Sequence, residues 1–169
     1  MPNARCPGTK RRLSAIAAAA VLALAACSAG NSRAPGPEVS TAALSEPETI
    51  STGLQSPWSI AFLDSTALVS ERDSGRILEL DGAGNQREAG LINAQGRGEG
   101  GLLGIAVQDG YLYSFLTAGD ENRIERRELR GAPGSLSLGE PQPVLSGIPA
   151  GPVHNGGRIA FGPDGMLYA

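Results

Sequence analysis

The chain has 169 residues, of which 41% are hydrophobic and 18% charged, and this is enough for one domain with a buried core. Its formal net charge is −3 and it has no lysine after Lys10, which excludes a basic patch suited to nucleic acid or anionic lipid. The 24 glycines and 12 prolines are dispersed between apolar runs, a pattern typical of many short strands joined by turns.

Residues 1–26 have the pattern of an export signal. Basic residues precede an alanine-rich apolar run at 13–26, which is shorter than the roughly 20 apolar residues of a membrane span. The sequence Leu24-Ala25-Ala26-Cys27 looks like a bacterial lipobox, which predicts that Cys27 becomes the lipidated first residue of the mature chain. Cleavage by an ordinary signal peptidase is the alternative.

The signal predicts where the protein is found and how it is held. We expect an exported protein, lipid-anchored to the outer face of the bacterial cell membrane, or a secreted or periplasmic one if Cys27 is not lipidated. Because Cys6 leaves with the signal, the folded part has no thiol for a disulfide or a Cys-ligated metal. Residues 27–49 are rich in Ser, Ala, Pro, Gly and Glu, so we predict a disordered tether before a folded part at 50–169.

One pattern returns three times in the folded part: a short apolar strand, an Asp or Asp-Gly turn, and a second strand. Equivalent alanines stand in each first strand: Ala61, Ala106 and Ala160. A strand-only repeat of about 40–50 residues is typical of a β-propeller blade, and chance similarity of Asp-Gly turns is the alternative. The predicted fold is therefore all-β, a β-propeller with about two blades and the start of a third.

The remaining pattern fits four-stranded blades. Strands are predicted, in chain order, at 59–62, 67–71, 76–80, 86–91, 104–107, 111–116 and 143–145. Residues 122–130 fit an exposed outer strand or a short helix, and a propeller favours the strand. The third copy, 158–168, ends soon after its second strand begins, so we expect the chain to be an amino-terminal fragment that is inactive alone.

His154 is the only histidine and stands at the entrance of the third copy. An imidazole titrates near neutral pH, so one held by tight backbone is a natural proton acceptor. A surface loop histidine is the alternative, because one residue is not a constellation.

Three stretches carry a more specific order of residues. The first box is Gly-Leu-Gln-Ser-Pro-Trp-Ser-Ile-Ala-Phe at 53–62 with Val-Ser-Glu-Arg at 69–72 and Gly-Arg-Ile at 75–77. The Gly-rich box is Gly-Glu-Gly-Gly-Leu-Leu-Gly-Ile-Ala at 98–106, and the His box, 154–165, begins His-Asn-Gly-Gly-Arg. Together they resemble the soluble, pyrroloquinoline quinone (PQQ)-dependent glucose/sorbosone dehydrogenases.

This resemblance implies a six-bladed propeller in which PQQ lies over the central channel and Ca²⁺ holds it. It implies that His154 contacts the cofactor and acts as the general base that removes the proton of the C1 hydroxyl of an aldose. The aldose then becomes a lactone as hydride passes from C1 to the quinone. Glu99 would bind sugar hydroxyls at the rim, and an external acceptor would take the electrons. Most PQQ and Ca²⁺ ligands are expected beyond residue 169, and no metal ligand is assigned here.

Some residues depart from the family pattern or have structural readings of their own. Glu99 replaces the Gln of some glucose enzymes and Val153 replaces their Asp, which favours the broader aldose sugar dehydrogenase branch. Glu99 is alternatively a turn carboxylate that accepts backbone N–H groups. We expect structural ion pairs or strand-end contacts for Glu71, Arg72 and Arg158, and core or inter-blade packing for Trp58. We expect tight backbone near the channel mouth at Gly100, Gly101, Gly156 and Gly157.

Two other functions stay open at this point. One is a non-catalytic propeller lipoprotein that binds carbohydrate or protein at the cell surface. The other is a metal-dependent lactonase-type propeller, whose several acidic and Asn ligands are not visible in these blades.

Overall fold

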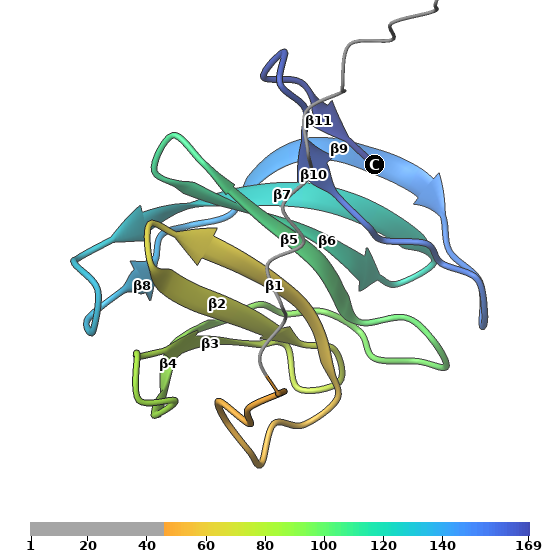
Figure 1. The fold of residues 1–169 in the computed structure, drawn as a ribbon. Coiled ribbons are helices and arrows are strands. Elements are labelled where there is room, and N and C mark those ends of the chain that lie inside the picture. Colours follow the sequence, from red (N-terminus) through yellow and green to blue (C-terminus); the bar gives the residue numbers. More distant parts are fainter. Residues whose placement is uncertain (1–45) are drawn as a thin grey trace, which may run out of the picture. The chain divides into compact units, whose positions relative to one another are not determined.

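The computed structural model describes residues 46–169, which form eleven strands (Figure 1). Within this range there is no helix, and so none that is long and apolar enough to cross a membrane. The all-β prediction is confirmed. The predicted signal, the lipidation site Cys27 and the tether up to residue 45 lie outside the described residues, while residues 46–49 are exposed and carry no strand.

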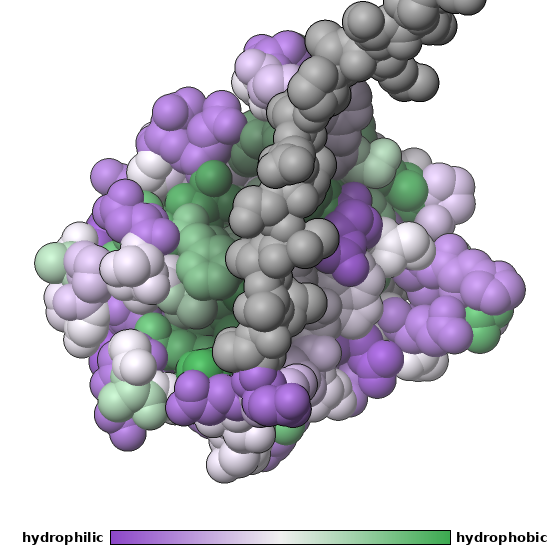
Figure 2. All heavy atoms as spheres, in the orientation of Figure 1, coloured by the Kyte–Doolittle hydropathy of each residue, from purple (hydrophilic) through white to green (hydrophobic). Residues whose placement is uncertain are grey.

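Blade 1 is an antiparallel sheet whose strands follow each other in chain order. Its members are β1 (Pro57–Leu63), β2 (Thr66–Glu71), β3 (Arg76–Leu80) and β4 (Gln86–Leu91). All four were predicted, and only the ends of β1 and β2 differ. On β1 the side chains alternate: Ala61 is buried, whereas Ile60 and Phe62 are 61% and 63% exposed on the other face. Figure 2 shows apolar surface, in green, on this side of the molecule.

Blade 2 is also antiparallel. Its members are β5 (Leu102–Gln108), β6 (Tyr111–Ala118), β7 (Glu121–Arg130), β8 (Ser137–Leu138) and β9 (Gln142–Pro149). It keeps chain order from β5 to β8, whereas β9 pairs with β7; the short strand β8 was not predicted from the sequence. The β5–β6 turn is the predicted Asp-Gly turn: Asp109 and Gly110 both have positive φ, 52° and 78°, as a two-residue hairpin turn of type I′ requires.

The prediction of an exposed outer strand at 122–130 is wrong in its exposure, although the segment is a strand. β7 pairs with β6 along one edge and with β8 and β9 along the other, so it lies inside the sheet. Its charges are compatible with burial because they pair with each other. The Glu125 carboxylate, 6% exposed, contacts Arg123 at 2.7 Å and Arg127 at 2.9 Å.

The third copy forms the hairpin of β10 (Ala160–Phe161) and β11 (Leu167–Tyr168). The first strands of the three copies are neighbours in space, since β5 contacts β1 on one side and β10 on the other. One apolar cluster fills the space between blades 1 and 2, and it includes Leu68, Ile77, Leu102, Leu112 and Leu116. A second joins blade 2 to the hairpin, and it includes Leu103, Phe115, Ile124 and Ile159.

A buried carboxylate joins blade 1 to the loop after β7. Glu79, on β3, is 3% exposed and accepts hydrogen bonds from Arg87 and from the backbone N–H groups of Gly134 and Leu136. Burial alone would raise the pKa of Glu79, but these hydrogen bonds and the Arg87 charge outweigh it and lower the pKa below the usual 4.5. The carboxylate therefore stabilises the folded state in its ionised form.

We expect Glu79→Gln to lower the free energy of unfolding by about 1–3 kcal/mol at pH 7, because an amide cannot accept this set of donors. A folded-state pKa below 4.5 means that the ionised group stabilises the fold above that pH and loses this effect as the pH falls through the lower value. The difference from wild type should therefore shrink below about pH 4.5 in urea unfolding experiments.

The matched control is Glu128→Gln, which removes a carboxylate that is 51% exposed and paired with Arg130 at the surface. It should change the free energy by no more than about 0.5 kcal/mol. Equal losses in the two variants would show that Glu79 does not join the blades.

Candidate active site

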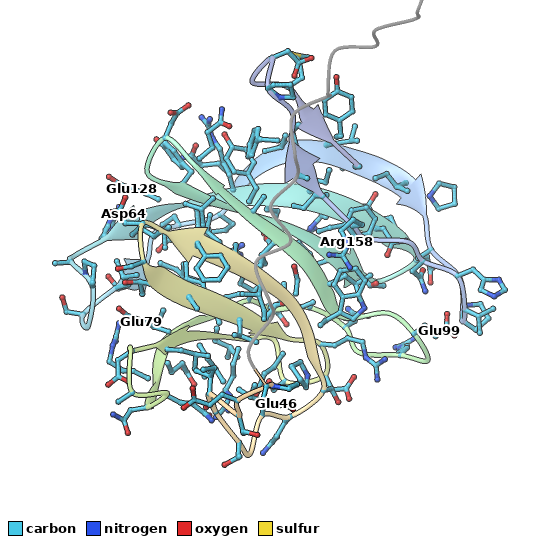
Figure 3. The ribbon with its side chains drawn as sticks, in the orientation of Figure 1. Glu46, Asp64, Glu79, Glu99, Glu128 and Arg158 are labelled. Atoms are coloured by element: carbon cyan, nitrogen blue, oxygen red, sulfur yellow. The ribbon has the colours of Figure 1, made fainter. Side chains whose placement is uncertain are left out.

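The three boxes meet where β1, β5 and β10 begin, because backbone hydrogen bonds join them. The N–H of Leu102 in the Gly-rich box donates to the carbonyl of Arg72 in the first box over 2.9 Å. The N–H of Gly104 donates to the carbonyl of Gly157 in the His box over 3.0 Å. Residues 30 and 53 positions apart in the sequence are thus in contact at one end of the molecule. Figure 3 shows Glu99 on the loop before β5 and Arg158 nearer to the strands.

Glycine is required for two of these approaches. A Cβ at Gly104 would lie 2.1 Å from the carbonyl oxygen of Gly157, and a Cβ at Gly98 would lie 2.1 Å from that of Pro152. Both atoms belong to backbone, which cannot swing aside as a side chain does. Of the glycines for which tight backbone was expected, Gly101 has it, since a Cβ there would lie 2.4 Å from the carbonyl oxygen of Arg72, whereas a Cβ at Gly156 would have no neighbour within 4 Å.

Glu99 and His154, the two predicted site residues, lie together. The backbone N–H of His154 donates to Oε2 of Glu99 over 2.7 Å, and the N–H of Glu99 donates to the carbonyl of Pro152 over 3.1 Å. Glu99 therefore does accept a backbone N–H, as one alternative predicted. Its Oε1 atom has no hydrogen-bond partner among residues 46–169, so the contact with substrate stays a prediction that this geometry permits.

The backbone of His154 is held in an uncommon conformation. Its φ is 63°, in the left-handed region that residues other than glycine rarely adopt. The side chain is exposed, and nothing in the described part of the chain hydrogen-bonds to its ring. Such a conformation costs free energy and persists where surrounding contacts impose it, which is frequent at functional sites.

Asn155 anchors the loop that carries His154, and sequence reasoning gave it no role. Its side chain is largely buried and bonds both backbone groups of Gly151: Oδ1 accepts from the N–H over 3.0 Å and Nδ2 donates to the carbonyl over 2.8 Å. Asn122 of β7 donates to the same Oδ1 over 3.1 Å. The only sequence signal for the contact between Asn122 and Asn155 is that the polar Asn122 stands at the start of a predicted strand. Such a residue does not by itself indicate a partner.

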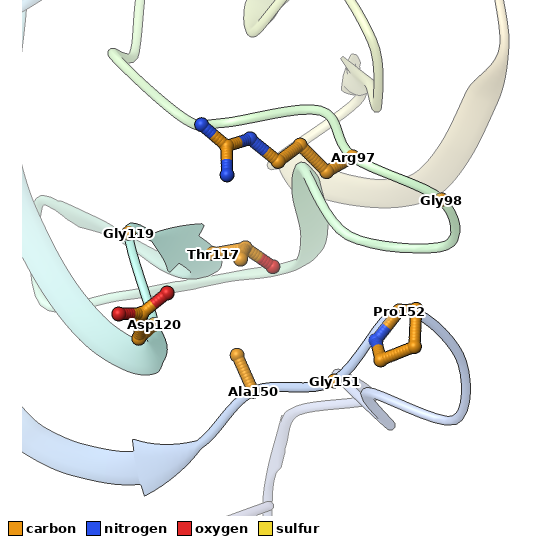
Figure 4. Close-up of a pocket in the computed structure, with 8 residues that line it drawn as sticks. All are labelled: Arg97, Gly98, Thr117, Gly119, Asp120, Ala150, Gly151 and Pro152. Carbon is orange, nitrogen blue, oxygen red and sulfur yellow. The ribbon is translucent and has the colours of Figure 1, made fainter.

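A pocket of about 260 Å³ has Pro152, whose carbonyl accepts the N–H of Glu99, in its wall (Figure 4). It is lined by Arg97, Gly98, Thr117, Gly119, Asp120, Ala150, Gly151 and Pro152. Arg97 and Asp120 stand on different loops of its wall, and neither forms an ion pair with another residue of 46–169. The pocket therefore presents one cation and one carboxylate to a small polar molecule.

The other candidates near these boxes are engaged in structural contacts, as expected. Glu71 is fully buried and pairs with Arg76 at 2.9 Å, and Arg72 pairs with Asp73 at 2.7 Å. The hydrogen bond to Asp73 raises the pKa of Arg72, and the negative charge of Glu99 contributes. Arg72 therefore stays charged beside Glu99.

Trp58 packs across the blades against the cluster that joins blade 2 to β10 and β11, as expected for inter-blade packing. The guanidinium of Arg158 lies over its indole ring, 5.5 Å from the centroid. The guanidinium groups of Arg158 and Arg72 can donate hydrogen bonds to carboxylates, and the indole ring of Trp58 offers a flat aromatic surface. These groups fit an aromatic cofactor that bears carboxylates, such as PQQ. Within 46–169, no three His, Asp or Glu side chains are grouped so as to hold a metal ion.

Comparison with known proteins supports the sequence resemblance. Residues 54–169 match the model of the Glucose / Sorbosone dehydrogenase family. Among solved structures, the PQQ-bound aldose sugar dehydrogenase of Streptomyces coelicolor is 45% identical with a TM-score of 0.68, and the match covers 72% of this chain and 39% of that one.

A second solved protein, from Thermus thermophilus, is provisionally assigned as an oxidoreductase (glucose dehydrogenase). It is 39% identical with a TM-score of 0.60, over 71% of this chain and 38% of that one. No curated protein sequence matches the chain. The chain thus spans about two fifths of the length of these two solved proteins.

We expect Gly104→Ala to separate the Gly-rich box from the His box, because its Cβ would overlap the carbonyl oxygen of Gly157. The free energy of unfolding should fall by about 1–3 kcal/mol, as for other overpacked sites. Urea unfolding gives this value, and the NMR signals of the single imidazole report whether the His box has moved.

Gly82→Ala is the matched control, since a Cβ there has no neighbour within 4 Å and its φ is not positive. It should unfold like wild type and leave the imidazole signals in place. The same His154 signals in both variants would contradict the role given to Gly104.

Proposed function

The chain belongs to the glucose / sorbosone dehydrogenase family, and on this premise we propose that it carries the general base and a sugar-binding residue of a PQQ-dependent aldose dehydrogenase. The observation that carries the proposal is the 2.7 Å hydrogen bond between the His154 backbone and the Glu99 carboxylate. It joins the residue proposed as proton acceptor to the residue proposed to bind sugar hydroxyls, although 55 residues separate them in the sequence.

The reaction we propose is oxidation of an aldose at C1. The exposed imidazole of His154 takes the proton of the C1 hydroxyl while the C1 hydrogen leaves with its two electrons, and the sugar becomes a lactone. PQQ, when bound, supplies the acceptor for that hydride. Because His154 is fixed through its backbone to Glu99, a sugar hydroxyl bound by Oε1 of Glu99 would be held beside the imidazole.

Other residues at this end have roles in binding. We propose that Arg158, stacked on Trp58, and Arg72, which keeps its ion pair with Asp73, attract the carboxylates of PQQ. The pocket lined by Arg97 and Asp120 offers hydrogen-bonding groups to the part of the sugar remote from C1. A Ca²⁺ cofactor and an external electron acceptor are proposed from the family resemblance alone.

The location of the enzyme is part of the proposal. Lipidation of Cys27 after removal of residues 1–26 would hold it at the outer face of the bacterial membrane, where it would meet sugars outside the cell. Metabolic labelling with a fatty acid tests this, because Cys27→Ser should abolish the label.

We expect His154→Ala to lower kcat for aldose oxidation at least about 100-fold, the usual scale for losing a general base. Dye-linked assays of protein expressed from its complete reading frame and supplied with PQQ and Ca²⁺ measure it. Arg126→Ala is the control, since this residue pairs with Tyr111 and Tyr113 on blade 2 and not with the boxes. Wild-type protein that binds PQQ yet oxidises no aldose would contradict the enzyme assignment.

A further inference from the structure

A line of buried hydrogen bonds runs from the Gly-rich box to the His box through the interior of blade 2. The N–H of Gly101 donates to Oγ1 of Thr117 over 3.2 Å, and Thr117 Oγ1 donates to Oδ1 of Asn122 over 2.8 Å. Asn122 Nδ2 then donates to Oδ1 of Asn155 over 3.1 Å. Asn155 is the neighbour of His154 in the chain, so the line ends at the proposed base.

Asn122 is the centre of this line. Its side chain is fully buried, and its amide forms a third hydrogen bond, from Nδ2 to the carbonyl of Pro149 over 3.2 Å. One amide therefore holds β6 through Thr117, the end of β9 through Pro149 and the His154 loop through Asn155. A hydroxyl has a single O–H and a carbonyl has none, so neither could donate to both Pro149 and Asn155 as the amide does.

Packing alone does not explain a polar side chain at this place. Ile124, the next residue on the same face of β7, is apolar and 3% exposed, so an apolar side chain suits this face. A buried amide costs free energy unless it is hydrogen-bonded, whereas a hydrogen-bonded one fixes the direction of its partners. The hydrogen bonds of Asn122 fix the positions of β6, the end of β9 and the His154 loop relative to one another.

We propose that Asn122 is a positioning residue that sets the place of the His154 imidazole relative to Glu99. Thr117 orients Asn122 from the side of the Gly-rich box, and Asn155 transmits its position to the His154 loop. With these contacts, His154 keeps its left-handed backbone conformation and its N–H points at the Glu99 carboxylate. The catalytic meaning of this positioning rests on the proposed function, but the positioning itself does not.

The single histidine makes a direct test possible by NMR on the full chain, without cofactor or substrate. Asn122→Asp keeps the shape and an acceptor for Thr117 but loses both amide donors, and Thr117→Val removes only the hydroxyl. In both we expect amide hydrogen exchange at His154 to be at least about tenfold faster and the imidazole signals to shift or broaden. The Gly84 amide, bonded to Asp81 in blade 1, should exchange as in wild type.

Ser114→Ala is the matched control, because it removes a buried hydroxyl of the same strand β6 that bonds the Glu125 carbonyl and not this line. It should leave His154 unchanged. Folded Asn122→Asp and Thr117→Val proteins with wild-type His154 exchange and signals would overturn the proposal. So would equal acceleration at His154 and Gly84, since that indicates general loosening.

Kinetics of the protein from its complete reading frame separate the two proposals. Asn122→Asp should lower kcat about 10- to 100-fold and leave KM for the aldose within about twofold, because the base is misplaced while the rim is intact. If the NMR changes occur and wild type oxidises no aldose, the proposed function fails and the positioning stands. If wild type is active and neither kcat nor the NMR signals change, the positioning fails alone.

Discussion

The candidate site depends on the close approach of three backbone segments, at Arg72, at Leu102 to Gly104 and at Gly157. Peptide groups this close satisfy each other's hydrogen bonds, and they leave no room for a Cβ at Gly104. The Gly-rich box is thus explained by contact between segments before any ligand is considered. His154 and Glu99 are brought together as a result, because each stands on one of the joined segments.

Buried carboxylates are paired within the blades, and Glu79 also joins blade 1 to the loop after β7. Glu71 and Glu79 are both ionised in the fold, because arginine and backbone N–H donors outweigh the effect of burial and lower their pKa values. Glu125 is likewise enclosed between two arginines. The two cysteines, at positions 6 and 27, precede the blades, so residues 46–169 contain no disulfide.

The sequence predicted what depends on local pattern, and it failed where distant residues decide. Alternation and Asp-Gly turns located the strands of blade 1, and the two residues selected from the boxes, Glu99 and His154, are in contact. The burial of β7 was missed, because Arg123 and Arg127 resemble a solvated face until their shared contact with Glu125 is seen. The Asn122 contact was missed for a similar reason, since its partner lies 33 residues away on another loop.

The central claim is that the end where β1, β5 and β10 begin binds the sugar with its C1 hydroxyl at His154. The most direct measurement is a crystal structure of the protein from its complete reading frame with PQQ and an aldose bound. We expect a ring nitrogen of His154 within about 2.6–3.2 Å of the C1 oxygen, and Glu99 in contact with another hydroxyl. A sugar bound elsewhere, or bound here with C1 remote from His154, would contradict the claim.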